Sequence, residues 1–407
     1  MERFFKDLNT LQRMRTVPLN EYMDQCAQRL CDLGYKRFSG RIRLRRLAHF
    51  GRWLKRRGIG LDQITPELVE SYLNRHGKVK DGDAVVLDWV LAWLRDKHVI
   101  RVMSAPDPDT PARQLEKEFA CYLEQERRLA PITIEDRRRF VRRFLVHRFG
   151  HGQPDLSKLC RRDVVDFVRE QAEYQPKRAH LLTTALRSFF TYLRYQGQIA
   201  TDLAAAVPAV ANWSLSSLPK ALPAEQVELL LTHCRRKTPM GLRDYAVLLL
   251  LARLGLRAGE VASLTLDDID WDAGQIKVCG KGGRCSELPL PADVGEAIAA
   301  YLQHGRQRCS SRLVFLRAAA PVGGFKGQSA VGLIVKHALA RAGIQSPRKG
   351  AHQLRHALAT QMLSRGASLA EIGELLRHSS PRTTSIYAKV DLTALRPLAL
   401  PWPGGEL

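Results

Sequence analysis

The sequence lacks the segments that would place a protein in or across a membrane. Its longest uninterrupted apolar run, Ala246 to Ala252, falls far short of the ~20 residues needed to span a bilayer. The first residues are charged and do not form the apolar stretch of a secretory leader. We therefore expect a cytoplasmic protein with no membrane partner.

Patterns typical of metal and nucleotide sites are missing as well. The 8 cysteines are scattered, with no Cys-x-x-Cys pair and no Cys/His finger spacing, which predicts reduced thiols and neither a zinc site nor a disulfide framework. There is no Walker-type loop and no carboxylate cluster suited to magnesium. These patterns give no reason to expect a metal ion or a nucleotide cofactor.

Negative charge is in short supply. The 407 residues include 64 Lys and Arg against 41 Asp and Glu, which gives a formal net charge of +23. An excess of this size points to a polyanionic partner, and without signs of membrane attachment that partner is nucleic acid. The basic residues are spread along the whole chain, which favours a protein that encloses its partner, although solvated arginine-rich helix faces would give the same count.

Two linkers rich in proline and serine, residues 104–111 and 208–223, divide the chain. They predict an N-terminal domain over 1–104, a second over 112–210, a third over 222–390 and a tail over 391–407. The segment Leu87–Arg95 recurs as Leu186–Arg194. The first two domains therefore look like copies of one all-α bundle.

The third domain has a mixed pattern. A nearly all-round apolar segment at 245–254 predicts a buried helix. After it, strand-like segments at 275–279 and 284–290 flank a glycine-rich turn and predict a hairpin. We therefore expect a mainly α protein with a small β-sheet in an α+β C-terminal domain.

Arginines crowd the polar faces of both predicted bundles. Such clusters could contact DNA phosphates, but taken alone they are more often solvated helix faces. The candidates are Arg41, Arg45 and Arg46 in the first bundle and Arg138, Arg139, Arg142 and Arg143 in the second.

Two motifs of the third domain place an arginine where it could hold an oxyanion. Arg257 follows a helix-ending glycine, with Glu260 one turn further on the same face, where it could orient the guanidinium. His352 and Arg355 share a helix face at i, i+3, with His356 next in the chain. A structural ion pair and a core histidine are the competing explanations.

A third motif adds a nucleophile. Pro381 would open a helix that presents Tyr387, with His378 just before it. In-line attack on a phosphodiester spreads negative charge that two guanidiniums can stabilise without a metal ion. A phenol of pKa ~10 needs a base or a positive field, which His352 could supply. Lys281, on the hairpin turn, could protonate the leaving oxygen, and His378 could donate a hydrogen bond to the phosphate.

In order and spacing, these residues resemble the motifs of the tyrosine recombinases, also called phage integrases, over residues 112 to about 390. The resemblance implies that 112–210 is a SAM-like core-binding domain and 222–390 the catalytic domain, closing as a clamp on duplex DNA. It implies catalytic roles for six residues and supporting roles for two, namely Arg257, Lys281, His352, Arg355, His378 and the nucleophile Tyr387, with Glu260 and His356 beside them.

The resemblance also implies an activity. A 3′-phosphotyrosyl intermediate would serve site-specific recombination in integration, excision or transposition of a mobile element, without a metal or cofactor. Strand exchange needs four active sites, so a homotetramer on double-stranded DNA is expected. The apolar tail over 391–407 would dock on a neighbouring subunit or fold back on its own domain. Related recombinases and accessory DNA-bending proteins stay open as further partners.

The sequence departs from the family pattern in three respects. Arg377 stands where glycine is usual, Ser286 where a basic residue is common, and Ala388 and Lys389 follow Tyr387 in place of threonine and histidine. None removes a catalytic group, so we expect them to affect site preference and assembly. Residues 1–104 carry no motif that assigns their role.

Two other functions compete with recombination. A type IB topoisomerase uses nearly the same chemistry, but the two bundles and the apolar tail favour a recombinase. A DNA-binding accessory or regulatory protein could keep the fold without catalysis, but the complete set of six residues argues against it.

Overall fold

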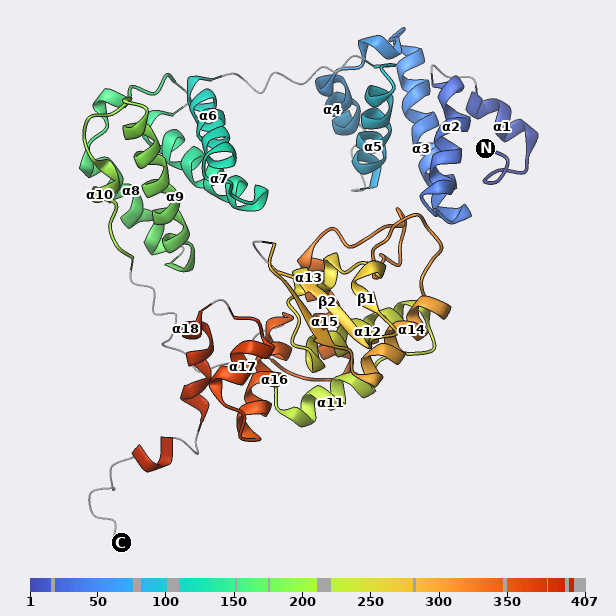
Figure 1. Cartoon of the computed structure of the whole chain (residues 1–407). Coiled ribbons are helices and arrows are strands. Elements are labelled where there is room, and N and C mark those ends of the chain that lie inside the picture. The colour runs from blue at the N-terminus through green and yellow to red at the C-terminus, as the bar shows by residue number, and fades with distance from the viewer. Residues whose placement is uncertain are drawn as a thin grey trace. The chain divides into compact units, whose positions relative to one another are not determined.

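The computed structural model describes most of the chain, and its elements are labelled in Figure 1. The described residues are 1–15, 19–75, 82–100, 110–150, 152–174, 176–210, 221–280, 283–346, 350–378, 380–391 and 395–398. They form two compact units, one of residues 1–64, 70–100 and 217–407 and the other of 65–69 and 101–216. The predicted linkers and tail lie largely outside the described residues, and the four-part division of the chain stays a prediction.

The N-terminal region is helical. In α3, the residues Leu44, Phe50 and Leu54 are buried, and this helix packs against α2 and α5. Pro66 begins α4, where the Leu68 N–H donates to Thr65 Oγ1 at 3.2 Å. The helices are α1 (Leu8–Arg15), α2 (Asn20–Asp32), α3 (Arg37–Arg56), η1 (Leu61–Gln63), α4 (Pro66–Arg75) and α5 (Gly82–Asp96).

The second region is also helical, and α9 contacts each of the other α-helices in it. Its core contains a cluster of phenylalanines, among them Phe144, which meets Phe167 edge-on at 5.3 Å and Phe190 at 5.4 Å. The helices are α6 (Pro111–Gln125), α7 (Pro131–Phe149), η2 (Leu156–Lys158), α8 (Arg161–Tyr174), α9 (Pro176–Tyr195) and α10 (Leu203–Ala206).

The C-terminal region combines helices with a small β-sheet, as predicted. The sheet has three antiparallel strands, because β1 joins the two strands of the predicted hairpin. The sheet order is β1 (Ile269–Asp270), β2 (Gln275–Cys279) and β3 (Cys285–Pro289), with Gln275 opposite Pro289. The helices are α11 (Ala224–Thr232), α12 (Pro239–Arg253), α13 (Ala258–Ser263), η3 (Leu266–Asp268), α14 (Ala292–His304), α15 (Gln328–Arg341), α16 (His352–Ser364), α17 (Leu369–Leu375), α18 (Pro381–Thr384), η4 (Ser385–Val390) and η5 (Arg396–Leu398).

Helix α12 lies at the centre of this region and contacts α11, α13, α14, α15 and α16 (Figure 1). Its apolar run Ala246–Ala252 is buried, as the sequence predicts, but the helix begins earlier than residue 245. Thr238 caps it by accepting from the Gly241 N–H at 3.1 Å, and Pro239 occupies the first turn. A capping threonine followed by proline is a strong helix start, so the polar first turn belongs to the helix.

The prediction of reduced thiols is wrong for one pair of cysteines. Cys279 and Cys285 are directly opposite partners on β2 and β3, with Cα atoms 4.0 Å apart, and they form a disulfide. Sequence spacing alone did not indicate this bond, because the antiparallel pairing of the hairpin brings the two thiols together. Six other cysteines among the described residues are free.

No helix among the residues that the structure describes has the length and apolar character needed to cross a bilayer.

Candidate active site

Arg257 is fixed by the start of the short helix α13. It occupies the N-cap position, and Glu260, at the third helical residue, reaches back to it. Glu260 Oε2 accepts from the Arg257 backbone N–H at 2.8 Å, while Glu260 Oε1 accepts from Arg257 Nη1 at 2.7 Å. A glutamate at this helix position commonly caps the backbone in this way. The predicted pairing of the two residues is therefore present, and one carboxylate orients both ends of Arg257.

Arg355 is held by two backbone carbonyls inside the domain. Its side chain, on α16, donates from Nη1 to the carbonyl of Gly255 and from Nη2 to that of Leu376. Gly255 has φ 58° and faces Leu376 so closely that a Cβ would lie 2.6 Å from that side chain, so the turn requires glycine. Burial, with Arg257 and Arg377 nearby, lowers the pKa of Arg355 to about 10. The guanidinium therefore remains charged at neutral pH.

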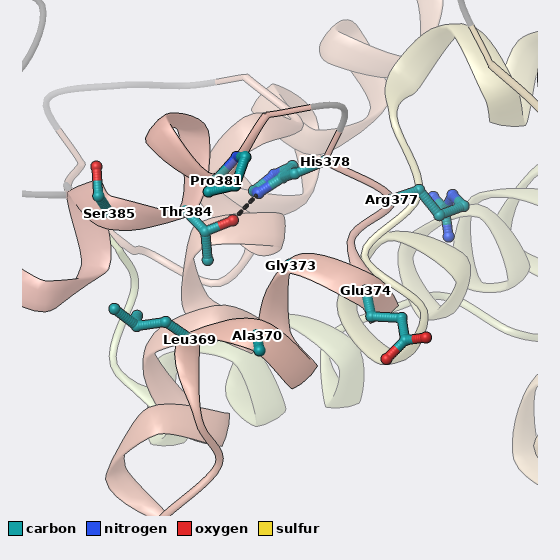
Figure 2. Close-up of a pocket in the computed structure, with 9 residues that line it drawn as sticks. All are labelled: Leu369, Ala370, Gly373, Glu374, Arg377, His378, Pro381, Thr384 and Ser385. Atoms are coloured by element: carbon teal, nitrogen blue, oxygen red, sulfur yellow. Dashed lines mark hydrogen bonds between the residues drawn. The ribbon is translucent and has the colours of Figure 1, made fainter.

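His378 follows α17 and is partly buried. Its Nδ1 lies 2.7 Å from the hydroxyl of Thr384, a buried residue of α18, and Figure 2 shows this bond between two residues that line a cavity. Burial lowers the pKa of His378 to about 4, and the positive charges of Arg355 and Arg257 act in the same direction. The imidazole is therefore neutral at physiological pH and is oriented by Thr384.

Tyr387 lies in the 3₁₀ segment η4 with only 1% of its surface exposed. Its ring packs in an apolar cluster with Ala359, Ile372 and Leu376. Its hydroxyl lies 2.9 Å from Nδ1 of His356. Burial raises the pKa of Tyr387, and the charge of Arg355 opposes that shift. The phenol is therefore protonated and enclosed.

The predicted helix at Pro381 is shorter than expected. Helix α18 ends at Thr384, and Tyr387 stands in the following 3₁₀ turn, not nearly two turns into one α-helix. The sequence pattern also predicted His352 beside the phenol. The hydrogen bond that the structure describes for the phenol goes instead to His356, and His352 is an exposed residue at the start of α16. The two imidazole centres are 6.4 Å apart.

Two cavities share Glu374, Arg377 and His378 in their linings. One, of about 480 Å³, is lined by Arg257, Glu260, Gly280, Arg284, Ser286, Glu374, Arg377 and His378. The other, of about 520 Å³ and mostly apolar, is shown in Figure 2 and is lined by Leu369, Ala370, Gly373, Glu374, Arg377, His378, Pro381, Thr384 and Ser385. The first cavity has a cationic wall suited to an anion.

Most of the predicted catalytic residues come together in the C-terminal region. Direct contacts link Arg257 with Glu260 and His356 with Tyr387, and the carbonyl of Leu376, next to Arg377 and His378, accepts from Arg355. Lys281, which follows β2 in the sequence, lies outside the described residues. Among the described residues, no group of three or more potential metal ligands is present.

Two residues of the site were not anticipated. Arg377 donates from Nη2 to Glu260 Oε2 at 2.8 Å, although the sequence analysis noted it only as a departure from glycine. Thr384 orients His378, and nothing in its local sequence marks this contact. Both interactions join different elements, which a local motif does not show.

The arginines predicted to contact DNA have different environments. Arg138 and Arg142 both pair with Glu116, which is 1% exposed, at 2.9 and 2.7 Å. Arg143 is exposed and donates to Gln171, and Arg139 is exposed.

In the N-terminal region, Arg41 and Arg45 have guanidiniums 5.4 and 5.8 Å from the ring of Phe5. Arg45 is exposed, whereas Arg41 and Arg46 are half-buried. A role in DNA contact stays a prediction for the whole set of arginines.

Comparison with known proteins agrees with this architecture. Residues 220–393 match the Phage integrase family, and residues 117–197 match the Phage integrase N-terminal SAM-like domain. A putative integrase/recombinase of Sinorhizobium fredii, y4rA, is 51% identical over 397 residues, which is 97% of each chain. Tyrosine recombinase XerD of Listeria monocytogenes is 32% identical over 293 residues, 69% of this chain and 95% of that protein.

A solved structure shares the fold. The lambda integrase tetramer bound to a Holliday junction aligns with a TM-score of 0.53 at 16% identity, over 68% of this chain and 76% of that chain. The expected fold class, mainly α with a small sheet, is confirmed. On the strength of the family matches and of relatives aligned over most of its length, the chain belongs to the phage integrase family of tyrosine recombinases.

Proposed function

We propose that Tyr387 cuts one DNA strand and later rejoins it, through a transient bond between its phenol oxygen and a 3′-phosphate. The observation that carries this proposal is the pair of guanidiniums, Arg257 and Arg355, held in fixed positions by Glu260 and by backbone carbonyls around one site. Family membership supports strand cleavage and rejoining in general, and the roles of individual residues are our assignment.

The chemistry follows from these groups. The Tyr387 oxygen attacks phosphorus, the bond to the 5′ oxygen breaks, and that oxygen takes a proton. Arg257 and Arg355 stabilise the charge on the non-bridging oxygens, because their positions need no rearrangement as that charge develops. His378, neutral and oriented by Thr384, donates a further hydrogen bond from Nε2. His356 accepts the phenol proton, and Lys281 on the hairpin turn gives a proton to the leaving oxygen.

The exposure of Tyr387 sets a condition on this reaction. With 1% of its surface exposed, its oxygen cannot meet a phosphate until the segment that carries it moves outward. Segment η4 is a short 3₁₀ stretch, a geometry with weaker hydrogen bonds than an α-helix. We assign the opening step to this segment, in response to DNA in the cationic cavity.

The assembly is proposed by analogy with relatives. The lambda integrase structure is a tetramer on a Holliday junction, and we propose the same stoichiometry on two DNA duplexes here. The exposed arginines Arg45, Arg139 and Arg143 are our candidates for backbone contacts. The kinship with proteins named integrase or recombinase favours movement or resolution of a DNA element over supercoil relaxation.

The test is covalent trapping. Nicked duplexes tiled across the DNA flanking the gene are incubated with protein in EDTA, so that the short 5′-hydroxyl fragment diffuses away and a covalent adduct accumulates. We expect an SDS-stable adduct on a 3′-phosphate with the wild type and with Tyr245→Phe, and none with Tyr387→Phe.

Two outcomes would count against the proposal. Saturated DNA binding without an adduct on any duplex would favour a non-catalytic accessory protein. Relaxation of a supercoiled plasmid without recombination of any flanking site would favour a topoisomerase.

A further inference from the structure

The turn that follows α17 has a left-handed residue at its centre. Arg377 N–H donates to the Glu374 carbonyl at 2.9 Å, and His378 N–H donates to that of Gly373, also at 2.9 Å. This pair of bonds is the Schellman ending of a helix, which places its central residue in the left-handed region, where glycine is favoured. The residue here is an arginine with φ 53°.

The backbone of this turn already serves the site. The Leu376 carbonyl accepts from Arg355 Nη2, and the next carbonyl, that of Arg377, accepts from Arg257 Nη2 at 3.2 Å. Two consecutive carbonyls thus hold the two arginines of the site. Glycine at position 377 could supply the same carbonyl with less conformational restriction, so the backbone contact does not explain an arginine side chain at this position.

The side chain of Arg377 turns back toward α13. Figure 2 shows it directed away from His378 and Thr384. Its Nη2 donates to Glu260 Oε2 at 2.8 Å and its Nη1 to the Leu375 carbonyl at 3.2 Å, and 11% of the side chain is exposed. It therefore binds the oxygen of Glu260 that does not hold the Arg257 guanidinium.

A carboxylate buried as deeply as Glu260, with 4% of its side chain exposed, needs compensation for its charge. Arg257 alone would share its positive charge between Glu260 and a substrate phosphate. With Arg377 bound to the second oxygen, Glu260 is neutralised from the other side, and more of the Arg257 charge remains available to an anion.

We propose that Arg377 is a positioning residue for Arg257: it fixes and neutralises Glu260, so that Glu260 orients the Arg257 guanidinium toward the scissile phosphate. This inference rests on the proposed function. Arg377 acts through Glu260 and leaves the binding of DNA nearly unchanged.

The test compares Arg377→Gly and Arg377→Lys with the wild type by rate of adduct formation over a range of DNA concentrations. Glycine adopts φ 53° readily, so the turn is retained, and circular dichroism confirms folding at the assay temperature. Arg128→Gly is the matched control, since Arg128 is a positive-φ arginine (φ 45°) in the other compact unit.

We expect Arg377→Gly to form the adduct about 10- to 100-fold more slowly at saturating DNA, the effect of a misplaced catalytic group. The half-saturating DNA concentration should stay within about twofold. Arg377→Lys keeps the positive charge but lacks the planar guanidinium, so it should recover part of the rate. Arg128→Gly should form the adduct as fast as the wild type. A neutral methylphosphonate at the scissile position should shrink the difference between wild type and Arg377→Gly, because less charge then needs to be stabilised.

A wild-type adduct with an equally fast Arg377→Gly variant would overturn this inference and leave the proposed function standing. A loss confined to DNA affinity would overturn it too, because Arg377 would then be a direct phosphate contact. Absence of the adduct in the wild type would overturn both proposals together.

Discussion

At the scale of single residues, the site holds its histidines by hydrogen bonds to hydroxyl groups. His378 contacts Thr384 and His356 contacts Tyr387, at 2.7 and 2.9 Å. Each bond fixes which ring nitrogen faces the hydroxyl, and so which nitrogen remains for another partner. For His378 the remaining nitrogen is Nε2, beside a cavity lined by Arg257 and Arg377.

The depressed pKa of His378 makes a prediction about stability and pH. In the unfolded chain its imidazole takes a proton near pH 6.5, whereas in the fold its pKa is about 4, because burial and Arg355 disfavour the charged ring. The stability it contributes is present above pH 6.5 and is lost as the pH falls from there toward 4. Urea unfolding at pH 7 and pH 5 should show a larger loss for the wild type than for His378→Asn.

His304→Asn provides a control in the same domain, at a histidine in the last turn of α14. This exposed residue lies outside the site, so the variant separates the loss of a histidine in general from the loss of His378. Equal losses for the wild type and His378→Asn would contradict a neutral, buried His378.

At the scale of elements, the facing ends of β2 and β3 are joined by the Cys279–Cys285 disulfide, and Lys281 lies between these two cysteines in the sequence. A covalent link between opposite residues limits the conformations of the short loop between them in the unfolded chain. The hairpin turn is therefore tied at its base, next to Gly280, which lines the cationic cavity.

Reduction should destabilise this hairpin measurably. We expect a reducing agent to lower the unfolding free energy of the wild type by about 2 kcal/mol, the size expected for a short loop. Cys279→Ser with Cys285→Ser should show no dependence on the reductant, and calorimetry with and without it is the measurement. If the reductant lowered the unfolding free energy of both proteins equally, the loss would come from other cysteines.

The elements also show what the sequence could predict. The hairpin, the buried helix α12 and the contact between Arg257 and Glu260 follow from alternation, apolar runs and i, i+3 spacing, all of which act within a few residues. The bonds from Arg377 to Glu260 and from Tyr387 to His356 join residues 117 and 31 positions apart. Such contacts depend on how α13, α16, α17 and η4 pack against one another. Local patterns in a single sequence do not reveal this packing.

The length of the final helix shows the same limit. Pro381 and the polar residues after it satisfy the rules for a helix start, yet α18 gives way to a 3₁₀ segment at Ser385. The burial of Tyr387 against Ala359 and Ile372 accompanies this change. Tertiary packing of one aromatic ring outweighs local helix preference here.

At the scale of the whole molecule, the net charge is +23. The arginines that contribute to it include some with internal partners and some that face solvent. Arg142 belongs to the first kind, since it neutralises the buried Glu116, whereas Arg139, on the same helix, is exposed. The count of 64 Lys and Arg therefore overstates the number of cationic groups available to DNA.

This difference predicts opposite effects of two neighbouring substitutions. Arg139→Ala should reduce the slope of log K against log salt for DNA binding by about one and change stability by less than about 0.5 kcal/mol. Arg142→Ala should leave the slope unchanged and lower the unfolding free energy by about 1–3 kcal/mol, because Glu116 loses a partner. Binding titrations at several salt concentrations and urea unfolding measure the two quantities.

An unchanged salt slope for Arg139→Ala would indicate that Arg139 faces solvent in the complex and does not contact a DNA phosphate. A reduced slope for Arg142→Ala would mean that this guanidinium leaves Glu116 when DNA binds.

The enclosure of Tyr387 in its apolar cluster has a consequence for unwanted cleavage of DNA outside the target site. A strongly basic protein spends much of its time sliding on DNA of irrelevant sequence. If Tyr387 cuts DNA as we propose, an always exposed phenol would risk a stray nick and a protein-blocked strand end at each such encounter. With the phenol covered by default, the proposed cleavage would be restricted to encounters that last long enough, and fit well enough, to draw Tyr387 out of its cluster.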